Sequence, residues 1–164
     1  MTPSRIAPQP GQESVWDYPR PPRLEPSHRH IRIVFAGETL VDTHGAFRVL
    51  ETSHPPVYYI PLSDIRQEFL TQTPSHSFCE WKGTASYYSV CVGDKEAADA
   101  GWFYPQPTPA FAPIAGSVAF YPSRMEACFV DDERVQAQPG DFYGGWITTD
   151  IAGPFKGAPG TRGW

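Results

Sequence analysis

The sequence is poor in leucine and cysteine and has no long apolar run, and each shortage excludes a class of protein. Only five of its 164 residues are leucine, whereas 19 are proline and 14 are glycine. Because proline breaks helices, long helices cannot be the main architecture. No run of about 18 apolar residues is present, so we expect no membrane-spanning segment. The first 14 residues also lack the apolar stretch of a secretory signal, and we therefore expect a cytoplasmic protein.

The three cysteines and the missing motifs argue against metal and cofactor sites. Cys79, Cys91 and Cys128 are odd in number, and we expect reduced thiols. None belongs to a C-x2-C pair, the usual contribution to a structural zinc site, so we predict no metal. The phosphate-binding patterns G-x-x-x-x-G-K-[ST] and G-x-G-x-x-G are absent, as are G-x-S-x-G and H-E-x-x-H. We accordingly predict no cofactor.

Charge is distributed unevenly in a chain whose formal net charge is −5. The segment 18–32 holds four arginines and one glutamate, whereas the segment 94–141 holds eight acidic and three basic residues. A protein that binds nucleic acid usually carries a strong basic patch rather than one short basic arm. We therefore expect no nucleic-acid partner. The arm is expected to pack against the acidic half of the same or a neighbouring molecule.

Short strands between turns account for most of the chain. We expect residues 1–14 to be mobile, residues 15–139 to form one domain, and residues 140–164 to form a glycine- and proline-rich arm. A short helix is predicted from Ser63 to near Leu70, a loop over 72–83 and a helical turn over 94–100. The fold class is mainly β and antiparallel, with one or two short helices. The strands are predicted at 31–35, 39–43, 46–51, 57–60, 84–92, 102–104, 116–121, 125–130 and 134–138.

A carboxylate stands where the apolar face of one predicted strand continues. If the strand over 46–51 alternates, Glu51 lies on the same side as Phe47 and Val49. A carboxylate on an apolar face is costly unless it is paired or used, so Glu51 is a candidate catalytic or binding residue. The alternative is a place at the strand end, where Glu51 reaches water or an arginine such as Arg48.

The run from Cys79 to Gly83 is the second candidate. A lysine such as Lys82 favours the reactive thiolate of a nearby cysteine such as Cys79. Trp81 offers its ring face to a cation or a flat ring. A lysine close to a buried glutamate is also a common acid–base arrangement. The alternative is a buried structural cysteine beside a lysine whose stem packs on apolar surface.

Aromatic residues are dense on the predicted strands. One sheet cannot bury them all with every hydroxyl satisfied, so some should line a pocket or an interface while others fill the core in place of leucine. These residues are Tyr58, Tyr59, Trp81, Tyr87, Tyr88, Trp102 and Tyr104.

The chain contains, in this order, the segments RVLET (48–52), PPVYYIP (55–61), CEWKGTASY (79–87), WFYP (102–105) and IAGSVAFY (114–121). Together they resemble the uncharacterised bacterial and fungal family known as domain of unknown function 427, with matching order and spacing from about residue 16 to residue 121. The tail segments 144–146 and 153–157 resemble one branch of it. One departure is Glu80, since the family often has proline after the cysteine.

The resemblance implies a β-tent, or Mss4-like, fold, in which two antiparallel sheets are pinned together at one edge and open at the other. Many relatives of that fold hold zinc with two C-x-x-C pairs. This sequence has no such pair, which implies a zinc-free β-tent. The open cleft is the natural ligand site. Carried over by position, the family pattern covers Arg48, Glu51, Tyr59, Cys79, Lys82, Tyr87, Trp102 and Tyr104.

Three functions follow as hypotheses. The first is binding of an unidentified small polar or aromatic molecule in a cleft between two sheets, with Glu51 and Lys82 as charged contacts. The second is an enzyme in the same cleft, with Glu51 as base, Lys82 orienting charge and Cys79 as a possible nucleophile. The third is a protein-interaction module that uses the arginine-rich arm or the C-terminal tail, and a homodimer is also compatible. In the first hypothesis, the further ligand-binding residues are Arg48, Tyr59, Trp81, Tyr87, Trp102 and Tyr104.

Overall fold

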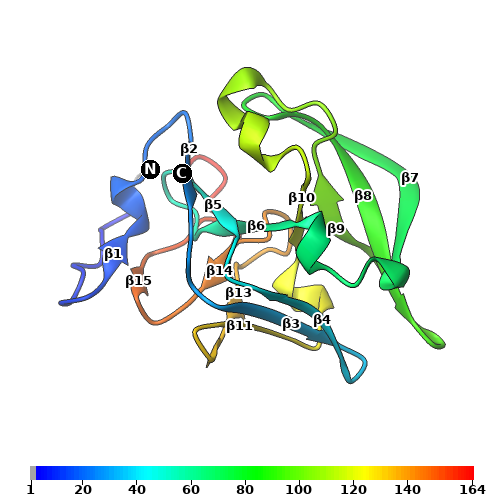
Figure 1. Ribbon diagram of the computed structural model, residues 1–164. Coiled ribbons are helices and arrows are strands. Elements are labelled where there is room, and N and C mark those ends of the chain that lie inside the picture. Colours follow the sequence, from blue (N-terminus) through cyan, green and yellow to red (C-terminus); the bar gives the residue numbers. More distant parts are fainter. Residues whose placement is uncertain (1–2) are drawn as a thin grey trace.

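The computed structural model describes residues 3–164, and the fold is mainly β, as the sequence predicts. Two antiparallel sheets dominate it (Figure 1). The larger sheet has seven strands in the order β2-β5-β6-β10-β9-β8-β7, and the smaller has four in the order β12-β11-β3-β4. No helix within residues 3–164 is long and apolar enough to cross a membrane.

The strands are β1 (Glu13–Ser14), β2 (Arg23–Pro26), β3 (Ile31–Phe35), β4 (Glu38–Thr43), β5 (Phe47–Leu50), β6 (Val57–Pro61), β7 (Leu70–Cys79), β8 (Gly83–Val92), β9 (Lys95–Phe103), β10 (Ser117–Phe120), β11 (Ala127–Val130), β12 (Glu133–Arg134), β13 (Gln136–Ala137), β14 (Trp146–Ile147) and β15 (Ile151–Ala152). The helices, all of them 3-10 turns, are η1 (Val15–Asp17), η2 (Leu62–Asp64), η3 (Gln67–Phe69), η4 (Pro109–Ile114) and η5 (Pro122–Arg124).

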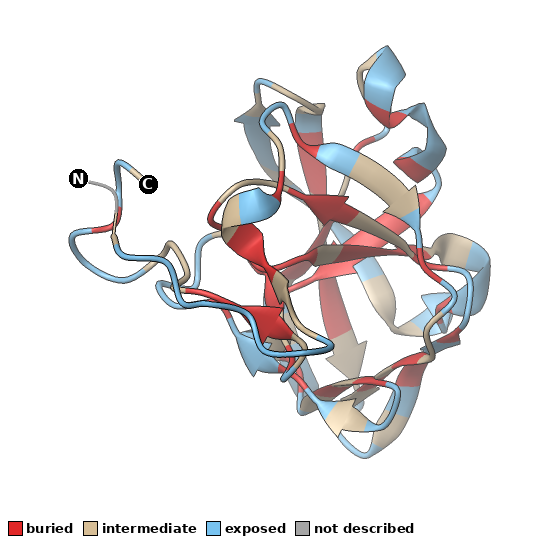
Figure 2. Cartoon of the chain, turned by 90° about the vertical axis from the view of Figure 1, so that its left-hand side faces the viewer, coloured by how far each residue is buried: buried red, intermediate tan, exposed pale blue. Residues whose placement is uncertain are grey.

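The main core fills the space between the two sheets, and the alternation of β6 and β10 shows how. Tyr58 and Ile60 of β6, together with Phe120 of β10, point into this core and meet Ile31 and Ile33 of the smaller sheet. All of these side chains are almost fully buried. Figure 2 shows buried residues, in red, along the strands in the interior of the molecule. Such residues keep the two sheets together because their apolar area leaves water only when both layers are in place.

The opposite face of the larger sheet carries a second apolar cluster. Tyr59 of β6 and Ala119 of β10, neighbours of the core residues in sequence, point to this side because side chains alternate along a strand. Trp102, Tyr104 and Phe111 complete its buried part, and Phe111 comes from η4. The four-stranded sheet contributes nothing to this cluster within the described residues, so this face is free to form a site.

Two segments differ from the sequence prediction. The loop predicted over 72–83 is largely strand β7, which pairs with β8 from Leu70 to Cys79. Pro74 lies in a bulge between Thr73 and His76 on an edge strand, where its missing N–H costs little. The side chain of Asp99 fixes this bulge by accepting hydrogen bonds from Thr73 Oγ1 (2.6 Å) and from Ser75 Oγ (2.7 Å).

The helical turn predicted over 94–100 is also a strand, β9. Its alanines and glutamate favour helix locally, but Gly93 with φ +58° and Asp94 form the turn of the β8–β9 hairpin, and pairing with β8 prevails. The helix predicted from Ser63 to near Leu70 is divided into η2 and η3. The predicted strands 31–35, 57–60 and 84–92 lie at or within one residue of β3, β6 and β8.

The segment around β1 and the C-terminal tail are attached to the rest of the fold. The N-terminal β1 pairs in parallel with the C-terminal β15, and β13 pairs with β14. Residues 1–14 were predicted to be mobile; residues 1–2 of that segment lie outside the described residues, while Glu13 and Ser14 form β1. Trp146 of β14 is almost fully buried against Tyr58, with ring centroids 5.1 Å apart.

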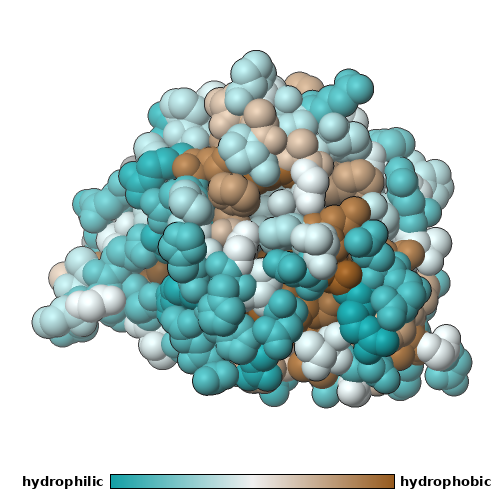
Figure 3. All heavy atoms as spheres, in the orientation of Figure 1, coloured by the Kyte–Doolittle hydropathy of each residue, from teal (hydrophilic) through white to brown (hydrophobic). Residues whose placement is uncertain are grey.

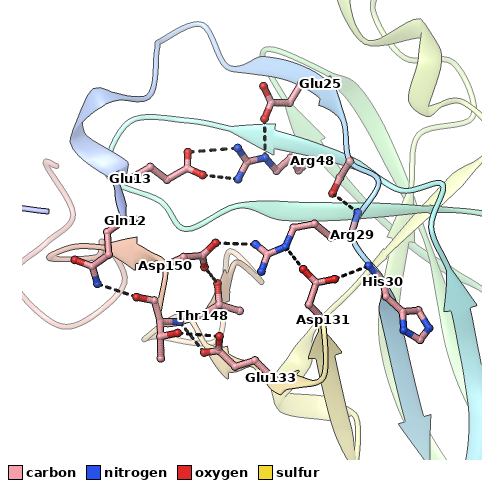
Figure 4. A network of polar contacts seen from close by, with 12 residues as sticks. Gln12, Glu13, Glu25, Arg29, His30, Arg48, Asp131, Glu133, Thr148 and Asp150 are labelled. Atoms are coloured by element: carbon pink, nitrogen blue, oxygen red, sulfur yellow. Dashed lines mark hydrogen bonds and ion pairs between the residues drawn. The ribbon is translucent and has the colours of Figure 1, made fainter. Parts of the chain in front are cut away.

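A network of ion pairs joins these ends to the sheets (Figure 4). Arg48 Nη1 donates to Glu13 Oε1 (2.9 Å), and Arg48 Nε donates to Glu25 Oε1 (2.7 Å). Arg29 bridges Asp131 and Asp150, with 2.7 Å at each contact. The basic arm therefore contacts the acidic half of its own chain.

Candidate functional site

A cavity of about 330 Å³ opens on the face of the larger sheet that is turned away from the smaller one. Its lining comes from strands β5 to β9, from the turn between β7 and β8, and from the C-terminal tail. The expected cleft between two sheets is therefore not what the fold builds. The space between the sheets is filled by the main core, and the hollow lies on the other face of a single sheet.

Neighbouring aromatic rings form the floor of the cavity. Trp102 Nε1 donates a hydrogen bond to Tyr59 Oη (3.2 Å), and the Trp102 and Tyr121 ring centroids are 4.6 Å apart. Burial raises the pKa of Tyr59 and of Tyr104, and it raises the pKa of Tyr121 to about 12. These hydroxyls are therefore neutral near pH 7, and the buried floor of the cavity carries no charge.

The turn between β7 and β8 brings Lys82 to one part of the cavity. The backbone of this turn is held by Thr108, the residue before η4, since Thr108 N donates to Lys82 O (3.1 Å) and Thr108 Oγ1 donates to Trp81 O (2.6 Å). Lys82 Nζ lies 5.8 Å from the Tyr104 ring centroid and 5.7 Å from that of Phe111. Within residues 3–164, no carboxylate oxygen lies within 4.0 Å of this ammonium group.

The corner after β5 brings Glu51 and His54 to another part of the cavity. Glu51 Oε2 lies 3.3 Å from Arg20 Nη2 and 3.9 Å from His54 Nδ1. His54 Nδ1 lies 2.9 Å from the carbonyl oxygen of Thr52, which can only accept, so Nδ1 carries the proton and Nε2 keeps a free lone pair. Burial lowers the pKa of His54, although the negative charge of Glu51 acts in the opposite direction. The imidazole ring is therefore neutral near pH 7.

The C-terminal tail supplies a third part of the wall. Tyr143 packs edge-on against His54 at 4.7 Å between ring centroids, and Lys156 Nζ lies 5.3 Å from the Tyr143 ring. Gly144 allows this approach, because a Cβ atom there would lie 2.5 Å from the Trp102 ring and its φ is +74°. A close backbone approach of this kind requires glycine.

All but one of the site residues predicted from sequence line this cavity. The exception is Arg48, which alternates to the other face of β5 and is engaged by Glu13 and Glu25. The side chain of Glu51 lies on the same face of the larger sheet as that of Val49, as strand alternation predicts. The predicted residues that the cavity brings together are Glu51, Tyr59, Cys79, Trp81, Lys82, Tyr87, Trp102 and Tyr104.

Several lining residues were not predicted. His54 follows Glu51 so closely that its place beside the strand exit could have been predicted from the sequence. Lys156 and Tyr143, in contrast, lie in a tail whose path is set by contacts with distant segments. Phe78 and Phe142 line the cavity and are 76% and 72% exposed. Apolar patches also reach the surface in the space-filling view (Figure 3). The unpredicted lining residues with polar or aromatic side chains are His54, Ser77, Phe78, Glu80, Tyr121, Phe142, Tyr143 and Lys156.

The described part of the chain has no group of side chains suited to bind a metal ion. Between residues 3 and 164, no cluster of three or more His, Cys, Asp or Glu side chains is arranged to hold a metal ion. The three cysteines are free thiols, and of these only Cys79 lines the cavity.

A family model described as "Domain of unknown function (DUF427)" matches residues 23–131. No curated protein matches the chain. The matched range contains the strands from β2 to β11 and ends before the tail that carries Tyr143 and Lys156.

Proposed function

The chain belongs to the DUF427 family, whose description states no activity, and we propose from its cavity that it binds a small molecule with a flat aromatic ring. The observation that carries this proposal is the meeting, in one cavity of about 330 Å³, of residues that lie far apart in the sequence. Such a volume is within the range of small-molecule sites, which are mostly apolar with a few placed polar groups.

The cavity has both kinds of group. The half-buried rings of Trp81 and Tyr87 supply apolar faces, which favour offset or edge contacts with another ring. The more deeply buried rings of Trp102, Tyr59 and Tyr104 complete the lining. Lys82 and Glu51 supply charge at the margins. A ligand that combines a flat ring with one or two polar substituents uses all of these groups together.

The test is a saturation-transfer NMR screen of single-ring aromatic compounds, repeated on two matched variants. Val57→Phe adds a ring inside the cavity, because Val57 is part of its lining. Val92→Phe makes the same change at the end of β8, outside the lining, and serves as the control. We expect binding to be lost in the first variant and kept in the second. The proposal is wrong if no compound binds, or if Val57→Phe binds as well as the wild type.

An enzyme acting in the same cavity is the second candidate, and His54 favours it. The ring is neutral, its tautomer is fixed by Thr52, and Glu51 lies beside it, an arrangement suited to a general base. Here Nε2 of His54 takes the proton, while Glu51, which Arg20 already pairs, stabilises the charged ring. In this candidate the general base is His54, whereas the sequence analysis gave that role to Glu51.

The two candidates are separated by His54→Asn. An asparagine amide keeps the hydrogen bond to Thr52 but has no group in the place of Nε2. If the protein turns over a ligand from the screen, this variant should still bind that ligand and should lose its turnover, both followed by NMR. Turnover that survives the substitution would exclude His54 as the base.

The interaction-module hypothesis has weaker support. Arg29 and Arg32 already pair with Asp131 and Asp132 of the same chain, which leaves less free charge for a partner. As for the fold, the two antiparallel sheets are compatible with a zinc-free β-tent, and we propose that assignment on the family resemblance alone.

A further inference from the structure

Lysine is rare in this chain, and its distribution is uneven. The sequence has only three lysines, Lys82, Lys95 and Lys156, in a chain of net charge −5. Two of the three line the cavity, and they come from segments 74 residues apart. None of the arginines lines it, so the cationic groups of the cavity are two flexible ammonium groups.

Neither lysine is neutralised by an acid. Among residues 3–164, no carboxylate oxygen lies within 4.0 Å of Lys82 Nζ or of Lys156 Nζ. Both are half-buried, and each ammonium group lies near aromatic rings, which attract a cation but do not cancel its charge. Each therefore keeps its charge and its hydrogen-bond donors available to a molecule in the cavity.

The acids of the cavity do not balance these lysines. Glu51 is paired with Arg20, a cation from outside the lining, so its charge is already compensated. Glu80 also lines the cavity, but it is exposed, and water screens its charge. His54 is neutral near pH 7 and adds none. The half-buried part of the cavity thus has an excess of positive charge within an acidic protein.

We propose that the ligand is an anionic aromatic molecule, whose ring packs against the half-buried rings of Trp81 and Tyr87 and whose carboxylate or phosphate group binds Lys82, Lys156 or both. This inference rests on the proposed function and narrows it to one class of ligand. The Tyr104 ring lies 5.8 Å from Lys82 Nζ and its hydroxyl is neutral, so this part of the cavity has no negative charge that would favour a cation.

Three probes of the same planar shape test the sign of the charge: benzoate, benzamide and benzamidine. Binding to the full-length protein is measured by NMR titration, with phenyl phosphate as a fourth probe that separates a phosphate from a carboxylate preference. We expect the anion to bind best, the neutral amide more weakly and the cation least. The preference should shrink as salt is raised, since the lysines are partly exposed to solvent.

Substitutions of the lysines then show which ammonium group binds the anion. Lys82→Met and Lys156→Met keep an apolar stem but remove the ammonium group, and Lys95→Met is the control, because Lys95 lies at the β8–β9 turn outside the cavity. Loss of a charge-assisted hydrogen bond should weaken binding of the anion by roughly tenfold to a hundredfold in at least one cavity variant. The control and the affinity for benzamide should not change. Lys→Arg at the affected position should restore part of the affinity, and thermal unfolding shows that each variant is folded.

Three results overturn the inference, and each can be distinguished from failure of the proposed function. If benzamide binds as tightly as benzoate and phenyl phosphate, the cavity binds aromatic molecules without regard to charge; the proposed function then stands and the inference is wrong. If the anions bind best but both lysine variants bind them like the wild type, the lysines are not the anion site. If none of the four probes binds while other compounds of the screen do, the inference is wrong and the proposed function stands; if no compound of the screen binds, both are wrong.

Discussion

Replacement of Arg48 by methionine should cost stability and leave ligand binding unchanged. The resemblance placed this arginine among the ligand-binding residues, whereas the fold places it on the opposite face of β5, with three hydrogen bonds to Glu13 and Glu25. Its side chain is only 16% exposed, while the two glutamates are 38% and 32% exposed. Methionine keeps the apolar stem but leaves both carboxylates without their shared partner.

The size of the effect follows from that exposure. Breaking a fully buried ion pair costs about 3–5 kcal/mol, and an exposed pair is worth at most about 1 kcal/mol. Because Arg48 is mostly buried and its partners are one-third exposed, we expect a loss of about 2–3 kcal/mol in the free energy of unfolding. For a chain of this size, that corresponds to a fall in Tm of roughly 4–12 °C.

Urea denaturation measures the stability of the variant, and NMR titration with an aromatic probe measures its binding. Glu25→Gln is a useful companion, because it removes one carboxylate charge from the same network and should cost less than the arginine replacement. The reasoning is refuted if Arg48→Met unfolds like the wild type yet loses affinity for the probe, since Arg48 would then act on the ligand.

Three further predictions concern single residues. Gly144→Ala should destabilise the fold by about 2–4 kcal/mol in urea denaturation, because of its positive φ and the clash with Trp102, whereas Gly37→Ala, with a similar φ and open space around it, should cost only about 1 kcal/mol. The pKa of His54 is lowered by burial in the folded state, so the unfolded chain binds the extra proton; stability should fall as pH drops below about 6.5, and His54→Asn should flatten this part of the profile. Burial raises the pKa of Cys128 to about 12, so iodoacetamide at pH 8 should modify this thiol only after unfolding, as read by mass spectrometry.

Much of the candidate site could be predicted because strand alternation is a local rule. Once 46–51 was identified as a strand, the side of Glu51 followed from that of Val49, and the same rule would have placed Arg48 on the other face. The resemblance, which carries no information about sides, grouped Arg48 with the ligand-binding residues. Strict use of alternation would have removed it.

The parts that could not be predicted depend on pairing between distant segments. Residues 94–100 have helical composition, and only the partner strand β8 makes them a strand. The position of Lys156 depends on a tail that crosses the molecule, pairs β15 with β1, and is held by Ser53 O, which accepts from Lys156 N (2.9 Å). No local pattern encodes such a path.

The bulge at Pro74 has a consequence for association between molecules. β7 is a ten-residue strand at the border of the larger sheet, and one of its sides has no neighbouring strand in the described chain. A regular edge strand of that length would readily pair with a strand from another copy, which would allow growth into fibres. Proline removes a donor there, and the bulge twists the backbone away from the regular spacing that a new strand needs. We therefore expect this irregularity to disfavour extension of the sheet by a second chain.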